Sequence, residues 1–234
     1  MWVAVSAASD RVRQFANAGN APALRVARWN GSAWSALGNG FDGTVRALIA
    51  FGADIVAGGD FTHSGATEVA HVARWNGTAW QAMAVGMNST VRALAVYNGV
   101  LYAGGDFTLA GGATIYGVAR WDGSAWQKLG GGLQFSDSVV TLAVAGDGIY
   151  AAGNFYSVAG NVAQGIARWD GSVWHVLGTG TDAGVGAGSI SGLAGNTTDV
   201  YAVGTFDTAG STISVNVARW QIGDRIFANG FDGG

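Results

Sequence analysis

Apolar and polar residues alternate in short runs along most of the chain, and a turn that contains glycine ends most of these runs. One stretch shows the pattern clearly, with runs that we name strands a, b, c and d at 72–75, 79–83, 91–96 and 101–105. Alternation with a period of two is typical of β-strands, whereas an amphipathic helix repeats its apolar positions every three to four residues. No segment shows the helical period, so the sequence predicts an all-β protein.

The four-strand pattern recurs along the chain with an almost constant period. The tripeptide Ala-Arg-Trp marks strand a, and its five arginines are Arg28, Arg74, Arg120, Arg168 and Arg219. In four copies a second tryptophan follows five residues after the first, at Trp34, Trp80, Trp126 and Trp174. Phe15 matches the phenylalanine that follows strand d in the later repeats, so the pattern reaches back toward the amino terminus. Four strands in about 46 residues indicate the blade of a β-propeller.

Short turns connect the strands within a repeat. The connections between strands a and b are Asn30-Gly31, Asn76-Gly77, Asp122-Gly123 and Asp170-Gly171. Such pairs favour a two-residue type I′ turn, in which both central residues have a positive φ. The connections between strands c and d include Asn98-Gly99 and Asp147-Gly148. We therefore expect both connections to be tight hairpins of this type.

Five repeats account for the full length of 234 residues. We predict a single domain, a five-bladed β-propeller with four antiparallel strands per blade. Its repeats cover about 26–71, 72–117, 118–165 and 166–216, and a split blade combines 217–234 with 1–25. In that blade Val217–Trp220 is strand a and Trp2–Val5 is strand c, which closes the ring and removes its open edges. Residues 10–14 are polar where strand d is elsewhere apolar, and a fragment of a larger ring is the alternative.

Composition narrows the classes of function. Only 12% of the residues are charged and the net charge is -3, which does not suit binding to nucleic acid. No apolar run reaches the length of about 18 residues that a membrane span requires. The absence of cysteine excludes disulfides, thiol catalysis and zinc–thiolate sites. The histidines His63, His71 and His175 lack the spacing of metal ligands, so we expect no metal and no cofactor.

Residues that recur in every repeat are best interpreted as structural. We expect the repeated Trp, Phe and Leu side chains to fill the space between neighbouring blades, because buried aromatic side chains contribute large apolar areas. The arginine of Ala-Arg-Trp lacks a constant acidic partner after strand d, where the sequence has Asp60, Asp106, Asn154 and Thr205. We therefore expect this arginine to donate to backbone carbonyls or to another polar atom near it, and so to fix one blade on the next.

A ligand is expected on one face of the molecule. In an antiparallel meander the b–c and d–a connections lie at the same end, and the b–c connection is the one whose length varies. Variable loops on a rigid scaffold commonly carry binding sites. The residues there that depart from the repeat are Phe41, Asp42, His63, Phe135, Asp137 and Asp182. A role in turn formation is the alternative for each of them, since aspartate also favours turns.

The repeats resemble a known kind of protein. The segments 118–130 (Val-Ala-Arg-Trp-Asp-Gly-Ser-Ala-Trp-Gln-Lys-Leu-Gly) and 101–107 (Leu-Tyr-Ala-Gly-Gly-Asp-Phe) are similar to repeats of secreted bacterial β-propellers of uncharacterised function. These propellers are distantly similar to kelch and galactose-oxidase-type propellers. The resemblance covers about residues 15–220 and implies the fold and not an activity, because the chain has no cysteine for the copper site of galactose oxidase. The end of the chain, 225–232, resembles a tail of secreted bacterial proteins.

These observations favour an extracellular, monomeric, non-catalytic propeller that binds a glycan or a protein partner through the face of the b–c and d–a connections. An alternative is a glycoside hydrolase or lyase that uses two of the acids Asp42, Glu68, Asp137 and Asp182. A third interpretation is a structural repeat domain within a larger surface protein.

Overall fold

The computed structural model describes residues 2–4, 15–135, 137–177, 188–210 and 212–222. These residues form an all-β fold, and none of them lies in a helix. This confirms the all-β character that the alternating pattern predicts. The described residues accordingly contain no helix that could cross a membrane.

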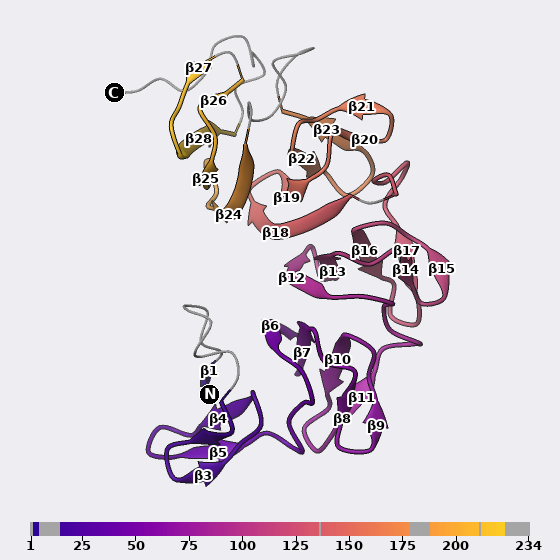
Figure 1. The fold of residues 1–234 in the computed structure, drawn as a ribbon, viewed down its shortest axis with the longest axis vertical. Helices are drawn as coiled ribbons and strands as arrows, with labels where there is room; N and C mark the ends of the chain where they lie inside the picture. Colours follow the sequence, from indigo (N-terminus) through magenta and orange to yellow (C-terminus); the bar gives the residue numbers. More distant parts are fainter. Residues whose placement is uncertain (1, 5–14, 136, 178–187, 211, 223–234) are drawn as a thin grey trace.

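The strands form five antiparallel sheets that follow one another along the chain, and Figure 1 shows them arranged along an arc. The first sheet contains β1 (Trp2–Ala4), β4 (Ala27–Trp29) and β5 (Trp34–Ala36). The second contains β6 (Val45–Phe51), β7 (Asp54–Gly59), β10 (Val72–Trp75) and β11 (Trp80–Ala82). The third contains β12 (Val91–Tyr97), β13 (Val100–Gly105), β16 (Val118–Trp121) and β17 (Trp126–Lys128). The fourth contains β18 (Ser138–Ala145), β19 (Gly148–Asn154), β22 (Ile166–Trp169) and β23 (Trp174–Val176). The fifth contains β24 (Ser189–Gly195), β25 (Asp199–Thr205) and β28 (Val217–Gln221).

The second, third and fourth sheets each group the predicted strands in the order c, d, a, b, whereas the described part of the first sheet has the positions d, a and b and that of the fifth has c, d and a. In the second sheet, for example, strand a pairs with the strand d that precedes it, with Arg74 opposite Val56. The chain returns from strand d to strand a through a small hairpin, and it leaves for the next sheet through the connection after strand b. The five small hairpins are β2 (Asn17–Ala18) with β3 (Ala21–Pro22), β8 (His63–Ser64) with β9 (Thr67–Glu68), β14 (Leu109–Ala110) with β15 (Ala113–Thr114), β20 (Ser157–Val158) with β21 (Asn161–Val162), and β26 (Thr208–Ala209) with β27 (Thr212–Ile213).

The ends of the chain do not pair as the split blade required. Trp2–Ala4 pairs with Ala27–Trp29 in the first sheet and takes the place that strand d has elsewhere, instead of acting as strand c beside the carboxy-terminal strand. Val217–Gln221 pairs with Asp199–Thr205 of its own repeat. Strand d is the most buried strand of the second, third and fourth sheets.

The turns between strands a and b differ from the predicted type I′ turns. Trp75 lies opposite Trp80, so the loop contains four residues, and of these Gly77 alone has a positive φ. The Asn76 side-chain oxygen accepts hydrogen bonds from the Thr78 N–H, the Thr78 hydroxyl and the Ala79 N–H at 3.0, 2.9 and 3.0 Å. The asparagine therefore shapes this turn through its side chain and keeps an ordinary backbone conformation.

The turns between strands c and d are shorter. Tyr97 lies opposite Val100, and both Asn98 and Gly99 have a positive φ, which confirms the predicted type I′ turn at this place. In the fourth sheet Ala145 lies opposite Gly148, so the turn residues there are 146 and 147, one residue earlier than predicted.

The core lies between neighbouring sheets. One cluster, for example, joins Val56 and Val72 of the second sheet to Val91 and Leu101 of the third. Strand d packs against strand c of the next sheet so closely that a Cβ on Gly104 would come within 2.6 Å of the Val139 side chain. Strand d needs glycine here because only a residue without a side chain leaves room for the valine.

The repeated tryptophans link the sheets, as the sequence predicts. The Trp80 indole N–H donates to the Leu37 carbonyl of the preceding sheet at 2.9 Å. Trp126 and Trp174 make the same hydrogen bond to Met83 and Leu129, at 3.1 and 2.9 Å. In four sheets the two tryptophans of strands a and b also lie against each other, with ring centroids 5.2 to 5.5 Å apart.

The arginine of Ala-Arg-Trp has a partner that the sequence interpretation missed. Arg219 donates to the Asp199 carboxylate at 2.8 Å, and Asp199 lies at the start of strand d. Arg74 and Arg168 form ion pairs with Asp54 and Asp147, which stand at the same end of strand d or in the turn before it. For these three arginines the partner is therefore not a backbone carbonyl but a nearby polar group, an acid at the start of strand d or in the turn before it.

The close approach of the sheets gives a prediction about stability. The substitution Gly104→Ala forces a methyl group against Val139, and we expect it to lower the free energy of unfolding by about 1 to 3 kcal/mol. Denaturant unfolding of the full chain measures this change. Val203→Ala is the matched control, because Val203 occupies the same position in the fifth sheet and is 45% exposed. An unchanged unfolding midpoint for Gly104→Ala would show that the sheets are not packed so closely.

Candidate functional site

The connections between sheets and the small hairpins together form one face of the protein, which we call the crossing face. Both start where strands b and d end, at the same end of the antiparallel sheets. Backbone hydrogen bonds join them: the Phe41 N–H donates to Leu24 of the first hairpin, and the Asp42 N–H donates to His63 of the second. The connection between the first and second sheets is therefore held between two hairpins, and the next connection is held in the same way through Met87 and Asn88.

Each small hairpin closes in the same way. Its last residue has a positive φ, and the N–H of that residue donates to the phenylalanine carbonyl that precedes the hairpin. The five residues in this conformation are Arg25, His71, Gly117, Gly165 and Asn216. Three of them have a side chain, which this conformation disfavours, so the surrounding hydrogen bonds must hold the backbone there.

Phe41 belongs to the core and not to the surface. Its side chain is 1% exposed, and its ring stacks on Phe61 with the centroids 4.0 Å apart. Trp80 covers another side of the ring, with the centroids 4.7 Å apart. A ligand on the crossing face therefore cannot reach Phe41.

Asp42 and His63 lie together on the crossing face. One Asp42 carboxylate oxygen accepts hydrogen bonds from the backbone N–H groups of Thr62 and His63, at 2.7 and 2.9 Å. The other accepts from the Thr62 hydroxyl at 2.7 Å and lies 3.2 Å from the His63 Nδ1 atom. Burial raises the pKa of Asp42, but the hydrogen bonds from His63 and Thr62 outweigh it and lower the pKa to about 2.

This arrangement has a counterpart in the next sheet that suggests what it does. Asn88 occupies the same place, and its side-chain oxygen accepts from the N–H groups of Thr108 and Leu109 at 2.9 and 2.8 Å. An amide thus replaces the carboxylate without loss of the contact. Asp42 therefore acts as a hydrogen-bond acceptor that anchors the hairpin.

The remaining predicted residues are distributed as follows. Phe135 is 71% exposed and meets the Tyr116 ring edge-on, with the centroids 5.9 Å apart. Burial raises the pKa of Asp137, and the hydrogen bond from the Gln134 N–H offsets only part of this rise. Glu68 lies exposed and opposite His63 in the second hairpin. Asp182 lies outside the described residues. The structure therefore brings together Asp42 with His63 and Glu68, and separately Phe135 with Asp137.

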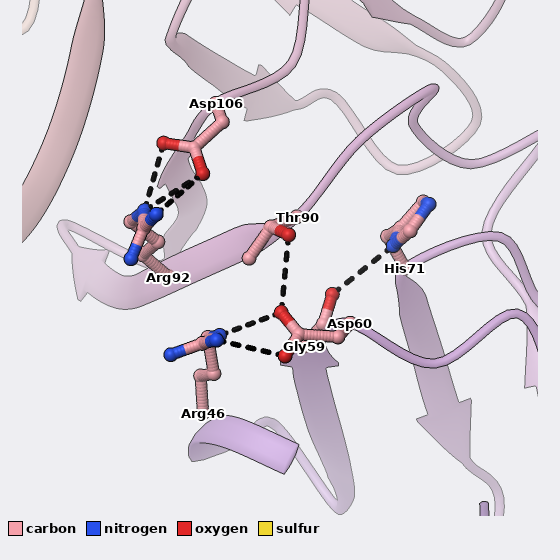
Figure 2. A network of polar contacts seen from close by, with 7 residues as sticks. All are labelled: Arg46, Gly59, Asp60, His71, Thr90, Arg92 and Asp106. Atoms are coloured by element: carbon pink, nitrogen blue, oxygen red, sulfur yellow. Dashed lines mark hydrogen bonds and ion pairs between the residues drawn. The ribbon is translucent and has the colours of Figure 1, made fainter. Parts of the chain in front are cut away.

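A polar network that sequence reasoning missed lies at the edge of strand c (Figure 2). Arg46 donates to both Asp60 oxygens at 2.6 and 2.8 Å, and the Thr90 hydroxyl of the next sheet donates to Asp60 at 3.0 Å. Arg92 and Asp106 form the equivalent pair, at 2.7 Å. Each arginine sits at a β-bulge, where the register of strand c shifts by one residue.

The network has an electrostatic cause and a sequence signal. Burial raises the pKa of Asp60, but the hydrogen bonds from Arg46 and Thr90 outweigh it, so the pKa is lowered. The hydrogen bond to Asp106 raises the pKa of Arg92. The signal is Val-Arg-Ala-Leu at 45–48 and 91–94, with each arginine 14 residues before its aspartate. The network joins the second sheet to the third through the hydrogen bond from Thr90 to Asp60. Each of its arginines is paired with an aspartate, so the network leaves no free charge for a ligand.

Apolar side chains form the most exposed feature of the crossing face. Val85 in the connection to the third sheet is 69% exposed, Leu109 of β14 is 39% exposed, and Phe135 is 71% exposed. Val85 borders the turn of the β14–β15 hairpin, and Tyr116 follows that hairpin and contacts Phe135. We name Val85, Leu109, Tyr116 and Phe135 the apolar patch. Of these four residues the sequence singles out Phe135, because the other three do not depart from the repeat in a conspicuous way.

The site was compared with known chemistry and known proteins. The described residues contain no group of three or more His, Cys, Asp or Glu side chains that could hold a metal ion. No protein-family model matches the chain, and no curated protein matches it.

The role of Asp42 as an anchor is testable. We expect Asp42→Ala to lower the free energy of unfolding by about 0.5 to 1.5 kcal/mol, because the Thr62 and His63 N–H groups lose their acceptor. Asp42→Asn should change it by less than about 0.5 kcal/mol, since Asn88 makes the same contact. Thermal unfolding of both variants provides the comparison. An equal loss in the two variants would mean that the negative charge matters and not the acceptor.

Acid should weaken the a–b turn of the third sheet. Hydrogen bonds from Ala125 and Ser124 lower the pKa of Asp122 to about 2. A carboxyl whose pKa is lower in the folded state stabilises it above the unfolded pKa, near 3.9, and this contribution disappears as the pH falls to about 2. We expect Asp122→Asn to be less stable than the parent chain at pH 7 and to lose less stability between pH 4 and pH 2. Parallel acid dependence of the two melting curves would contradict this.

Proposed function

We propose that the five sheets are the blades of a β-propeller, and that the chain is a non-catalytic extracellular binding module. Three observations support the propeller. The sheets share one strand order, with three strands of it in the first and fifth sheets; the second, third and fourth sheets each pack strand d against strand c of the next; and the sheets follow an arc (Figure 1). The resemblance of the repeats and of the segment 225–232 to secreted bacterial proteins supports the extracellular location.

The apolar patch carries the proposal of binding. Large apolar side chains are exposed there, and exposed apolar surface commonly marks a site of interaction. The patch rests on hairpins and connections that are fixed by hydrogen bonds, for example from the Gly111 N–H to the Gly86 carbonyl at 2.8 Å. Its shape is therefore set before a partner arrives, which reduces the entropy lost on binding.

The chemistry of the patch favours a partner protein. Val85 and Leu109 are aliphatic and can bury area but cannot donate or accept hydrogen bonds with sugar hydroxyls. A hydrolase would need two free carboxyl groups, whereas Asp42 is bound in the hairpin anchor. The second candidate is a glycan that stacks on Phe135, because its ring is 71% exposed beside the Tyr116 ring.

Substitution of the patch tests the proposal. We expect the double variant Val85→Lys, Phe135→Lys to lose at least about tenfold in affinity for a partner captured by the parent chain, since both substitutions place charge in apolar contact area. Val173→Lys is the control, because Val173 is 52% exposed and lies in an a–b turn at the opposite end of the sheets. Affinity is measured by surface plasmon resonance, and a glycan array with the same variants decides between the two ligand classes. Retention of full affinity by the double variant would contradict the proposal.

A further inference from the structure

Each sheet has one face that is turned toward the next sheet along the chain, which we call its outgoing face. In four of the five sheets the following sheet covers this face. The exposed fraction of one residue, the first of strand a or the one before it, shows how completely the outgoing face is covered. Its exposed fraction is 1% for Val26, 0% for Val72, 2% for Val118 and 3% for Ile166. The equivalent residue of the fifth sheet, Val217, is 58% exposed. In the described residues, therefore, no sheet covers the outgoing face of the fifth sheet.

Two neighbours of Val217 show the same difference. Tyr201 is 39% exposed, whereas Tyr102 and Tyr150 at the same position are each 2% exposed. Val203, which pairs directly with Val217, is 45% exposed. We name Tyr201, Val203 and Val217 the terminal face. Arg219 beside it is neutralised by Asp199 at 2.8 Å, so no net charge opposes an apolar partner there.

The first sheet shows the complementary half of the contact. Trp80, Trp126 and Trp174 each donate an indole hydrogen bond to a carbonyl of the preceding sheet. Trp34 holds the same position in the first sheet, next to Trp29, and makes no such bond to any residue that the structure describes. One chain therefore has two complementary surfaces without a partner among the described residues. The outgoing half of the contact is the terminal face of the fifth sheet, and the incoming half is the surface of the first sheet that carries Trp34.

The side chain of Val203 restricts which sheet can cover it. The position is Gly58 in the second sheet and Gly104 in the third, where a Cβ would lie 2.5 or 2.6 Å from the valine of strand c in the next sheet. A sheet with such a strand c does not fit over Val203 at this spacing. The described part of the first sheet consists of strands in the positions d, a and b, and it contains no strand c.

We propose that the terminal face binds the first sheet of a second copy of this chain, in place of the monomer that the sequence predicts. A second copy is favoured over the same chain, because the first sheet is present in this structure and Val217 remains 58% exposed. Figure 1 shows the first and fifth sheets at the two ends of the arc. Each copy carries both halves of the contact, so two copies either close on each other or extend into longer assemblies.

Sedimentation velocity of the full chain over a wide range of concentration tests the association. We expect the parent chain to associate, and Val217→Lys and Trp34→Lys each to weaken association at least about tenfold, since each substitution removes one half of the contact. An equimolar mixture of the two variants should form a 1:1 complex and nothing larger, because each variant retains the half that the other lacks. Val173→Lys, at an exposed a–b turn, should associate as the parent chain does.

Other outcomes overturn the proposal in distinguishable ways. A parent chain that stays monomeric at every concentration means that the terminal face is covered within one chain or not at all. Association that only Val217→Lys abolishes, without rescue in the mixture, means that two terminal faces meet each other. Trp34→Phe keeps the ring contact with Trp29 and lacks the N–H donor, so its weaker association, with an unchanged melting temperature, separates a lost contact from a damaged fold. Binding through the apolar patch is measured independently of these variants.

Discussion

The packing of one sheet on the next is the interaction on which the rest of the structure depends. A four-stranded sheet of this size cannot bury both of its faces by itself, so each sheet is stable because its neighbour covers it. Gly104 admits the valine of the following strand, and the Trp126 indole fixes the direction of the contact through a carbonyl of the preceding sheet. The crossing face follows from this packing, because the connection between two sheets must run across the end where their hairpins meet.

The structure separates residues for stability from residues for contact. The tryptophans Trp80 and Trp126 are each 3% exposed and serve the core. The polar network around Asp60 joins two sheets through Arg46 and Thr90 and is neutral as a unit. The apolar patch, which we propose as the binding surface, lies on the hairpins and connections, outside the contacts that hold the sheets together.

The sequence predicts the strands well and their grouping less well, for a physical reason. Alternation and the repeat period depend on local burial, so the strands c and d and the turn at Asn98 and Gly99 lie where expected. Which strands share a sheet depends on the connection after strand d. The small hairpin there returns the chain to the same sheet, so strands d and a pair, and the chain crosses to the next sheet after strand b. The predicted site was partly wrong for the same reason. Phe41 was selected because it departs from the repeat, but the packing shows that it lies against Phe61 inside the core. The acid partners of the arginines were not predicted, because they stand at the start of strand d or in the turn before it, whereas the repeat drew attention to the position after strand d.

The a–b turns also bear on how the protein ages. Asparagine followed by glycine is chemically labile, because the glycine N–H can attack the side-chain amide and release ammonia, and hydrolysis then leaves aspartate or isoaspartate. At Asn76 the aspartate product would keep every hydrogen bond of the turn, since Asp122 already accepts the same three from Ser124 and Ala125. Slow conversion of the asparagine to aspartate would therefore leave the fold unchanged and would add one negative charge. Isoaspartate lengthens the backbone, so its formation would disturb the spacing between the two tryptophans of strands a and b.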